Sequence, residues 1–208
     1  MKNLIVKNSL YLMTALGIIV AIFTAIFWSE MEMLQRLVSI LFTGLILHLW
    51  EEGKLPGGFT TMITDKLNFT AKSPHFGEGV TVLYVLIIVS LPFIFPHVPI
   101  LAFAALYLGI LEVFAHLMAI KMYDKSSIYS PGLITSVIVL LPVSIYAIVY
   151  AVQNGLMQPI DWLYSFLILL GGLGLAQQIV VRGSGMKYSE FLNNVKSALF
   201  TKEKKNID

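Results

Sequence analysis

The 208-residue chain has no cysteine and few charged residues. The lack of cysteine excludes disulfide bonds, thiolate metal sites and cysteine nucleophiles. Charged residues make up only 12% of the chain, about half of what a soluble domain carries, while 57% are hydrophobic and the mean hydropathy is +0.81. This balance excludes a disordered chain, and a net charge of +2 gives no reason to expect nucleic acid as a partner. The composition therefore predicts an integral membrane protein with no sizeable domain outside the bilayer.

Six stretches are long and apolar enough to cross a hydrocarbon core of about 30 Å, which takes roughly 20 residues of helix. We expect these spans at residues 9–28, 33–50, 80–96, 99–120, 131–152 and 160–181. The third is interrupted by Pro92 and Pro96. The predicted fold class is all-α, a polytopic bundle of six transmembrane helices that forms one domain over residues 1–182.

The basic residues are distributed unevenly between the two sides of such a bundle. With six spans, 13 of the 14 Lys and Arg residues fall on the side that holds both termini and the 51–79 and 121–130 connections, and only Arg36 falls on the other. Positively charged loops stay in the cytoplasm. We therefore expect both termini to be cytoplasmic in a multi-pass protein of a cell membrane, for which a bacterial plasma membrane is the expected setting.

Two cytoplasmic segments have a pattern of their own. In the tail, residues 183–208, apolar side chains recur at helical spacing at Tyr188, Phe191, Leu192, Val195 and Leu199. With lysines between them, they predict an amphipathic helix that lies on the anionic inner leaflet. The 51–79 connection is long enough to be functional, and a surface loop or a short interfacial helix is the alternative.

The most informative residues are ionisable groups inside or beside the spans. His48, Glu51 and Glu52 end the second span, and Glu112 and His116 share one face of the fourth. Residues three or four apart lie on one face of a helix, so each helix presents carboxylate and imidazole together. Glu112 is nine residues inside Lys121, about 13 Å deep, where a bare carboxylate has to be protonated, paired or bound to metal. The two helices could hold one cation between them.

Two simpler interpretations of the same residues stay open. The second span could end in a solvated polar segment, as helix ends in membranes commonly do. Glu112 and His116 could form a hydrogen-bonded pair that only holds helices together.

The fifth span opens with a turn that contains Tyr129, Ser130, Pro131, Gly132 and Thr135. Ser130 is a good N-cap and Pro131 a good first helical residue. The free amides of this helix start could bind a lipid phosphate or a carboxylate. A well-made helix start with no ligand is the alternative.

The segment His48-Leu49-Trp50-Glu51-Glu52 resembles the HXXEE family of small integral membrane proteins, whose other motifs are NXXXH and YXPGXXT. The turn from Tyr129 to Thr135 matches the last motif at every fixed position. His116 matches the middle motif, but Glu112 stands where asparagine is expected. The resemblance implies a membrane protein suspected of being an enzyme, with no known reaction. Because of that departure, we rank Glu112 below the other candidate ligands.

Our first functional hypothesis is a metal-dependent membrane enzyme that acts on a lipid-like substrate from the cytoplasmic side. The candidate metal ligands are His48, Glu51, Glu52, Glu112 and His116. Imidazole and carboxylate ligands without thiolate suit Zn²⁺, Mn²⁺ or non-haem iron. In a hydrolytic version, Glu51 or Glu52 takes a proton from metal-bound water. Tyr129, Ser130, Gly132 and Thr135 would bind the substrate or its developing negative charge. An iron version would activate oxygen instead.

Two other classes are kept. A proton-linked transporter would use the glutamates and histidines as a relay, and it requires polar side chains that continue to the opposite face. A non-catalytic membrane module would bind a partner or lipid, and its polar pairs would serve only to hold helices together. The oligomeric state does not follow from the sequence.

Overall fold

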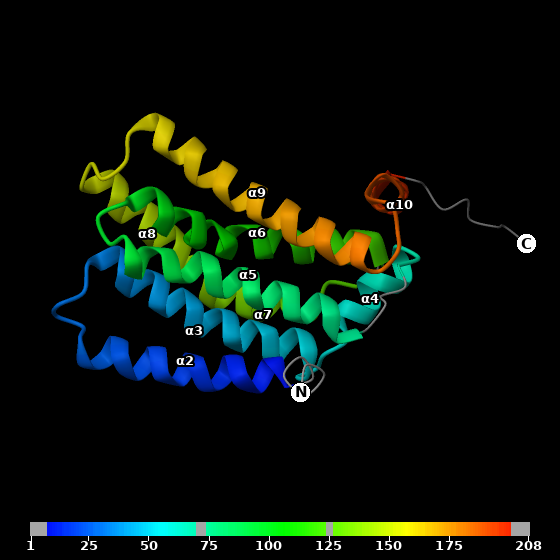
Figure 1. Cartoon of the computed structure of the whole chain (residues 1–208), viewed down its shortest axis with the longest axis horizontal. Helices are drawn as coiled ribbons and strands as arrows, with labels where there is room; N and C mark the ends of the chain where they lie inside the picture. Colours follow the sequence, from blue (N-terminus) through cyan, green and yellow to red (C-terminus); the bar gives the residue numbers. More distant parts are fainter. Residues whose placement is uncertain (1–7, 70–73, 124–126, 201–208) are drawn as a thin grey trace, which may run out of the picture.

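The computed structural model describes residues 8–69, 74–123 and 127–200, which contain helices and no strand (Figure 1). The helices are α2 (Ser9–Ile26), α3 (Met33–Gly53), α4 (Phe59–Lys66), α5 (Pro74–Ile94), α6 (Pro99–Tyr123), α7 (Leu133–Thr135), the π-helix η1 (Ser136–Leu140), α8 (Leu141–Gln153), α9 (Pro159–Gly183) and α10 (Tyr188–Phe200). The segments α7, η1 and α8 form one continuous span, Leu133–Gln153, which we call the fifth span. Among these described residues, six helices are long and apolar enough to cross a membrane, which confirms the predicted fold class.

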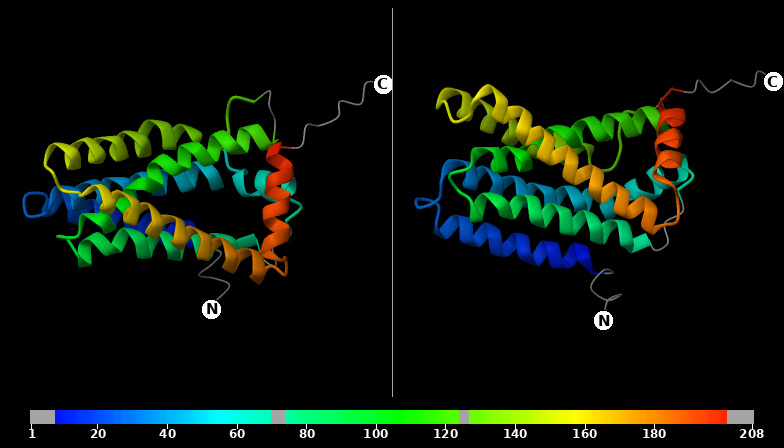
Figure 2. Two further views of the ribbon diagram at one scale, coloured as in Figure 1. Left: turned by 90° about the horizontal axis from the view of Figure 1, so that it is seen from above. Right: turned by 45° about the horizontal axis from the view of Figure 1, so that its top comes forward.

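The long helices run along one axis, and α10 lies across one end of the bundle (Figures 1 and 2). Within the most apolar stretch of each spanning helix, 56% of the residues are buried in α3 and 44% in α6, against 17–22% in the other four. The two helices that carry the ionisable residues are therefore the central ones. The others have apolar faces directed outward, as lipid-facing helices require.

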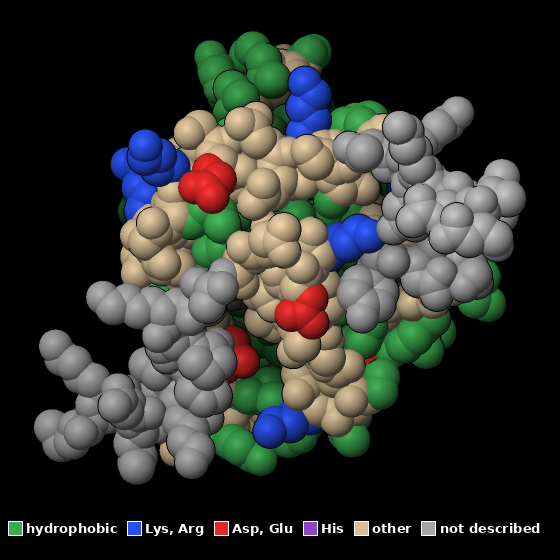
Figure 3. Space-filling view, turned by 90° about the vertical axis from the view of Figure 1, so that its right-hand side faces the viewer, with side chains coloured by type: hydrophobic (Ala, Val, Ile, Leu, Met, Phe, Trp, Pro, Cys, Tyr) green, Lys and Arg blue, Asp and Glu red, His purple; other side chains and the backbone are tan. Residues whose placement is uncertain are grey.

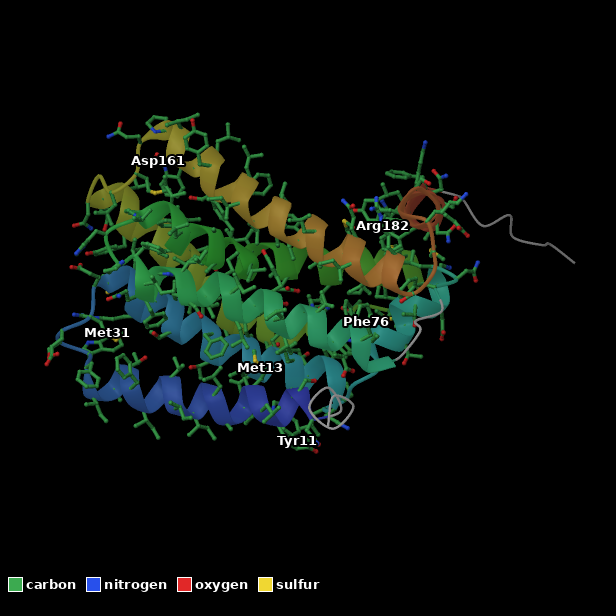
Figure 4. The ribbon with its side chains drawn as sticks, viewed as in Figure 1. Tyr11, Met13, Met31, Phe76, Asp161 and Arg182 are labelled. Atoms are coloured by element: carbon green, nitrogen blue, oxygen red, sulfur yellow. The ribbon has the colours of Figure 1, made fainter. Side chains whose placement is uncertain are left out.

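Basic residues gather at the end of the bundle where α4 and α10 lie, which we call the lysine-rich end. Figure 4 shows Phe76 and Arg182 at this end, and Met31 and Asp161 at the opposite one. Figure 3 looks onto the lysine-rich end, where Lys and Arg side chains are spread around the face. Arg36 belongs to the opposite end, where its guanidinium lies 5.1 Å from the centre of the Trp28 ring. By the positive-inside rule the lysine-rich end is predicted to face the cytoplasm.

Two details differ from the sequence predictions. Helix α5 begins at Pro74 rather than at residue 80, and it continues through Pro92 to Ile94. A proline removes one amide donor, and a packed neighbour can keep the helix in place. The Gln35 side chain of α3 donates a hydrogen bond of 3.2 Å to the Pro92 carbonyl. This carbonyl is one of the last four of α5, and the last four carbonyls of a helix have no partner within it.

Close packing at two glycines brings the fifth span against both central helices. A Cβ atom added to Gly44 of α3 would lie 2.8 Å from Val139, and one added to Gly109 of α6 would lie 2.6 Å from the carbonyl oxygen of Leu140. Neither position has room for a larger side chain. The fifth span is thus fixed against the two helices that carry the candidate ligands. Its first residues lie next to these ligands.

At the lysine-rich end, α10 packs against α6 and α9 as the predicted amphipathic helix. Phe191 of α10 is buried in a small apolar cluster with Leu67, Met122 and Val181, while Leu192 and Phe200 remain exposed. The 51–79 connection contains α4, so a short helix is present there.

Candidate metal centre

The candidate ligands lie near the lysine-rich ends of α3 and α6. Helix α3 continues three residues beyond its predicted end, to Gly53, so His48, Glu51 and Glu52 are all helical. Helix α6 extends to Tyr123 and keeps Glu112 and His116 one turn apart on one face. Both histidines are buried, with exposed fractions of 2% for His48 and 0% for His116. The structure therefore places two imidazoles in the interior between the central helices.

Four side chains converge on one point, namely His48, Glu52, Glu112 and His116. The Nε2 atoms of the two histidines lie 3.4 Å apart. The Oε1 atom of Glu52 lies 3.6 Å from His48 Nε2 and 3.5 Å from His116 Nε2. The Oε2 atom of Glu112 lies 3.5 Å and 4.0 Å from the same two nitrogens. All four atoms lie within 4.8 Å of one another.

These distances suit a metal ion. Four ligand atoms placed tetrahedrally at the usual bond length of about 2.1 Å from zinc would be about 3.4 Å apart. Four of the separations given above are 3.4–3.6 Å. Of the five separations given above, the one from Glu112 to His116 is longer, at 4.0 Å, and the sixth, between the two carboxylates, is at most 4.8 Å. The four residues could therefore hold a divalent cation after small shifts, mainly of Glu112.

The carboxylates form the accessible side of the group. Glu52 has a side-chain exposure of 19% and Glu112 of 27%, whereas the imidazoles have almost none. Phe59, the first residue of α4, lies against the imidazole of His116 with ring centres 4.6 Å apart. The sequence did not predict this contact of Phe59. The one feature that pointed to Phe59 was its place in the long 51–79 connection.

The turn before the fifth span holds the other nitrogen of each imidazole. His48 Nδ1 lies 3.0 Å from the carbonyl oxygen of Gly132 and 3.0 Å from Thr135 Oγ1. His116 Nδ1 lies 3.0 Å from Ser130 Oγ, whose hydroxyl can donate to the carbonyl of His116 itself at 3.3 Å. Contacts of this kind orient metal-binding histidines in proteins.

These contacts indicate where the ring protons are. A carbonyl oxygen only accepts, so His48 Nδ1 donates to Gly132 and carries the proton in the neutral ring. Its Nε2 then presents a lone pair to the group of four. If the Ser130 hydroxyl donates to the His116 carbonyl, the Ser130 oxygen is free to accept a hydrogen bond from His116 Nδ1. The Nε2 atom of His116 then also carries a lone pair directed at the group of four.

Gly132 is required at its position for two reasons. Its φ angle of +104° is one that residues with a side chain rarely adopt. A Cβ atom there would also overlap the His116 ring and lie 2.8 Å from Cε1 of His48. The turn thus passes directly over both imidazoles.

Glu51 is not part of the group of four. Its carboxylate accepts hydrogen bonds from the hydroxyl of Tyr129 (2.9 Å), the amide of Ile134 (3.2 Å), and the amide and hydroxyl of Thr135 (2.8 and 2.6 Å). Burial and the hydrogen bond to Glu51 raise the pKa of Tyr129 to about 12. Of the five residues predicted as ligands, the structure brings four together, whereas the carboxylate of Glu51 accepts hydrogen bonds from the Tyr129–Thr135 turn.

The expected start of the fifth span is wrong in its details. Ser130 is not the N-cap, because the helix begins after Gly132 and the Ser130 side chain contacts His116. The amides of Ile134 and Thr135, expected to be free for an external anion, donate to Glu51. The four turn residues predicted to bind substrate therefore surround the imidazoles and Glu51.

One protein family matches this chain. Its sequence profile, described as protein of unknown function with HXXEE motif, covers residues 3–147, which include all the residues of the group of four and of the turn. Neither the comparison with curated proteins nor that with solved structures gives a match. The chain belongs to the HXXEE family, and its described residues contain six helices that are long and apolar enough to cross a membrane.

Proposed function

We propose that this protein binds one divalent cation between α3 and α6 and uses it in a membrane-embedded enzyme. The observation that carries the proposal is the convergence of four acceptor atoms, two imidazole nitrogens and two carboxylate oxygens, within 4.8 Å. His48 Nδ1 donates to Gly132, and when the Ser130 hydroxyl donates to the His116 carbonyl, His116 Nδ1 donates to Ser130. No ring proton is then left to lie between the Nε2 atoms of neutral imidazoles. Acceptors this close repel one another unless a cation lies among them.

The donor set favours particular metals. Two imidazoles and two carboxylates, with no thiolate, suit Zn²⁺, Mn²⁺ or non-haem iron. His48, His116 and Glu52 form the tighter part of the set, with separations of 3.4–3.6 Å. Two histidines and one carboxylate are the ligands of many hydrolytic zinc sites and of non-haem iron sites. We propose these three as the constant ligands.

Glu112 fits a different role. It is the most exposed member of the group, and its 4.0 Å contact with His116 is the longest of the four between a carboxylate and an imidazole. A carboxylate that can move out of the metal's coordination sphere opens a position for water and can then accept a proton from it. A bound divalent ion supplies a water of lowered pKa. We assign the base role to Glu112, in place of Glu51 or Glu52.

The position of the group supports a substrate dissolved in the membrane. His48 and Glu52 lie in one apolar membrane-spanning helix and Glu112 in another, near their lysine-rich ends. The exposed side of the group is formed by the two carboxylates, and the aromatic ring of Phe59 covers His116. A molecule with a polar headgroup and an apolar body could reach such a group from the inner leaflet. We propose a lipid-like substrate and hydrolysis as the reaction class.

A proton relay is the competing function, because a proton could occupy the same group. Such a relay needs a polar path toward the opposite end of the bundle. The buried hydroxyls in that direction are bonded to nearby backbone: Ser39 donates to Gln35, and Ser144 donates to Leu106. Because these hydroxyls already donate to backbone carbonyls, they do not supply the polar path that a proton relay needs. A metal ion is therefore favoured over a relayed proton as the occupant of the group of four.

Metal analysis of the detergent-purified protein tests the proposal. Loaded with Zn²⁺, Mn²⁺ or Fe²⁺ and then washed, the protein should retain about one ion, and the His48→Ala and His116→Ala variants should retain none. His97→Ala, in the connection between α5 and α6 at the opposite end, is the matched control and should bind normally. Wild-type protein that retains no ion after loading would overturn the proposal. Mass spectrometry of phospholipid vesicles incubated with the loaded protein then tests the hydrolytic part.

A further inference from the structure

We propose that Glu51 is a positioning residue: through the Thr135 hydroxyl it reinforces the tautomer of His48 that the Gly132 carbonyl also requires, and through the Tyr129–Thr135 turn it places the partners of both histidines. The inference rests on the proposed metal site in one respect, the prediction of metal affinity. It assigns to Glu51 neither ligation nor proton transfer. It also gives the turn a role other than binding substrate.

The first step concerns the charge state of Glu51. Its two oxygens accept from four donors: the Tyr129 hydroxyl, two backbone amides and the Thr135 hydroxyl. An ionised carboxylate is an acceptor only, and these four donors fill its lone-pair directions. A protonated carboxyl would donate one hydrogen, which only the hydroxyls of Tyr129 and Thr135 could accept, and it would then lose one of these four donors. The four contacts therefore favour the ionised form of Glu51, in which all of them are donors.

The second step follows the single hydroxyl hydrogen of Thr135. It can point to Glu51 Oε2 at 2.6 Å or to the Gly132 carbonyl at 3.2 Å. An O–H bond to a carboxylate is shorter and stronger than one to a neutral oxygen, and 2.6 Å is a typical length for it. The hydrogen therefore points to Glu51. The Thr135 oxygen then faces His48 Nδ1, 3.0 Å away, as an acceptor.

The third step gives the tautomer. His48 Nδ1 now has two acceptors before it, Thr135 Oγ1 and the Gly132 carbonyl, and must carry the proton. The Nε2 lone pair then faces the group of four. Without the negative charge of Glu51, the Thr135 hydroxyl is free to rotate and donate to Nδ1, which would move the ring proton to Nε2. A proton on Nε2 directed into the group would compete with a metal ion.

The turn extends the same constraint to His116. Tyr129, Ile134 and Thr135 hold Glu51 from either side of Ser130 and Gly132, so Glu51 fixes the turn in place. Ser130 Oγ is buried and lies 3.0 Å from His116 Nδ1. One carboxylate thereby positions the partners of both rings.

Metal affinity in a matched pair of variants tests the inference. Thr135→Val removes the hydroxyl at nearly constant shape, and Thr135→Ser restores it. We expect Glu51→Gln to weaken Zn²⁺ binding about 10- to 100-fold, the range for residues that hold metal-binding histidines, because its Thr135 hydroxyl can donate to His48 Nδ1. Thr135→Val has no hydroxyl to donate and should bind more tightly than Glu51→Gln, and Thr135→Ser should bind like wild type. Thermal unfolding of the metal-free proteins shows whether a variant is folded. Wild-type affinity in folded Glu51→Gln would overturn the inference.

A second measurement needs no metal. The chain has four histidines, and replacing His75 and His97 by glutamine leaves only the two of the site. ¹⁵N NMR of metal-free protein labelled at histidine then shows which ring nitrogen carries the proton. We expect the proton on Nδ1 of both rings in the wild type, and a mixture at His48 after Glu51→Gln, in which the Thr135 hydroxyl is free to donate to Nδ1. Thr135→Val leaves only the Gly132 carbonyl before Nδ1 and should keep the proton there.

The two experiments separate the inference from the proposed function. If the wild type retains no metal but its His48 proton is on Nδ1 and shifts in Glu51→Gln, the inference holds and the metal proposal fails. A wild-type His48 with its proton on Nε2 would overturn the inference whatever the metal result. If Glu51→Gln does not fold, Glu51→Asp, which withdraws the carboxylate from Thr135, takes its place in both measurements.

Discussion

The Nε2 atoms of His48 and His116 lie 3.4 Å apart, although 68 positions separate the two residues along the chain. The ring centres are 5.0 Å apart and the ring planes are at 74°. The rings thus meet at their edges rather than stacking face to face. An edge contact through nitrogen is what two ligands of one ion require, because metal bonds lie in the plane of each imidazole.

Gly132→Ala should disturb the site more than Gly155→Ala, a substitution at another positive backbone angle. At Gly132 the new methyl group would overlap His116, whereas Gly155, with φ of +60°, has no atom within 4 Å of an added Cβ. We expect both variants to lose about 1–3 kcal/mol of unfolding free energy from backbone strain. Only Gly132→Ala should also lose metal binding. Retention of wild-type metal affinity in Gly132→Ala would contradict the geometry described.

Glu52 and Glu112 should differ when each is replaced by glutamine. Glu52 lies 3.6 and 3.5 Å from the two imidazole nitrogens, whereas Glu112 lies 3.5 and 4.0 Å from them. We expect Glu52→Gln to weaken metal binding by more than about 100-fold, beyond the usual effect of a residue outside the ligand shell, and Glu112→Gln to weaken it by about tenfold. Calorimetric titration with Zn²⁺ measures both. If both variants lost the same Zn²⁺ affinity, the assignment of Glu52 as a constant ligand and of Glu112 as the base would be wrong.

Tyr129 should resist ionisation at high pH. Its pKa is raised to about 12 by burial and by its hydrogen bond to Glu51, against about 10 for an unfolded tyrosine. The native state therefore holds this proton more tightly than the unfolded state. The stability that this contributes is complete below about pH 10 and is lost as the pH rises toward about 12.

The measurement for Tyr129 is the phenolate absorbance of the wild type minus that of Tyr129→Phe. At about pH 11, a phenol of pKa 12 is about one-tenth ionised, whereas one of pKa 10 is about nine-tenths ionised. We expect the difference spectrum to contain almost no phenolate at that pH while the protein stays folded. A full phenolate signal there would show that the contact between Tyr129 and Glu51 is absent.

Gly109→Ala should destabilise the bundle through the contact between α6 and the fifth span. An added Cβ would overlap Ser144 and lie 2.6 Å from a backbone oxygen, which cannot rotate away. Gly171→Ala in α9 is the control, because nothing lies within 4 Å of the added methyl group. We expect Gly109→Ala to cost about 1–3 kcal/mol, as overpacking does, and Gly171→Ala to be neutral or slightly stabilising. Denaturant unfolding in detergent compares them, and equal stabilities would rule out the close packing.

Much of the site was accessible from helical spacing alone. His48 and Glu52 are one turn apart, and so are Glu112 and His116, so each pair had to share a face whatever the tertiary structure. The turn of the fifth span was also recognisable as a motif. The role of its members was not, because Ser130 and Gly132 act on rings that come from other helices.

The sequence by itself determined the six apolar helices long enough to cross a membrane, their all-α class and the place of the ionisable residues within them, because hydropathy and helical periodicity are local properties of the chain. Only the tertiary structure decided that Glu51 and Glu52, neighbours in sequence, take different partners. Consecutive residues on a helix point about 100° apart, so one carboxylate reaches α6 and the other reaches the turn before the fifth span. Which neighbour occupies each direction is a matter of how the helices pack, and no local pattern contains it.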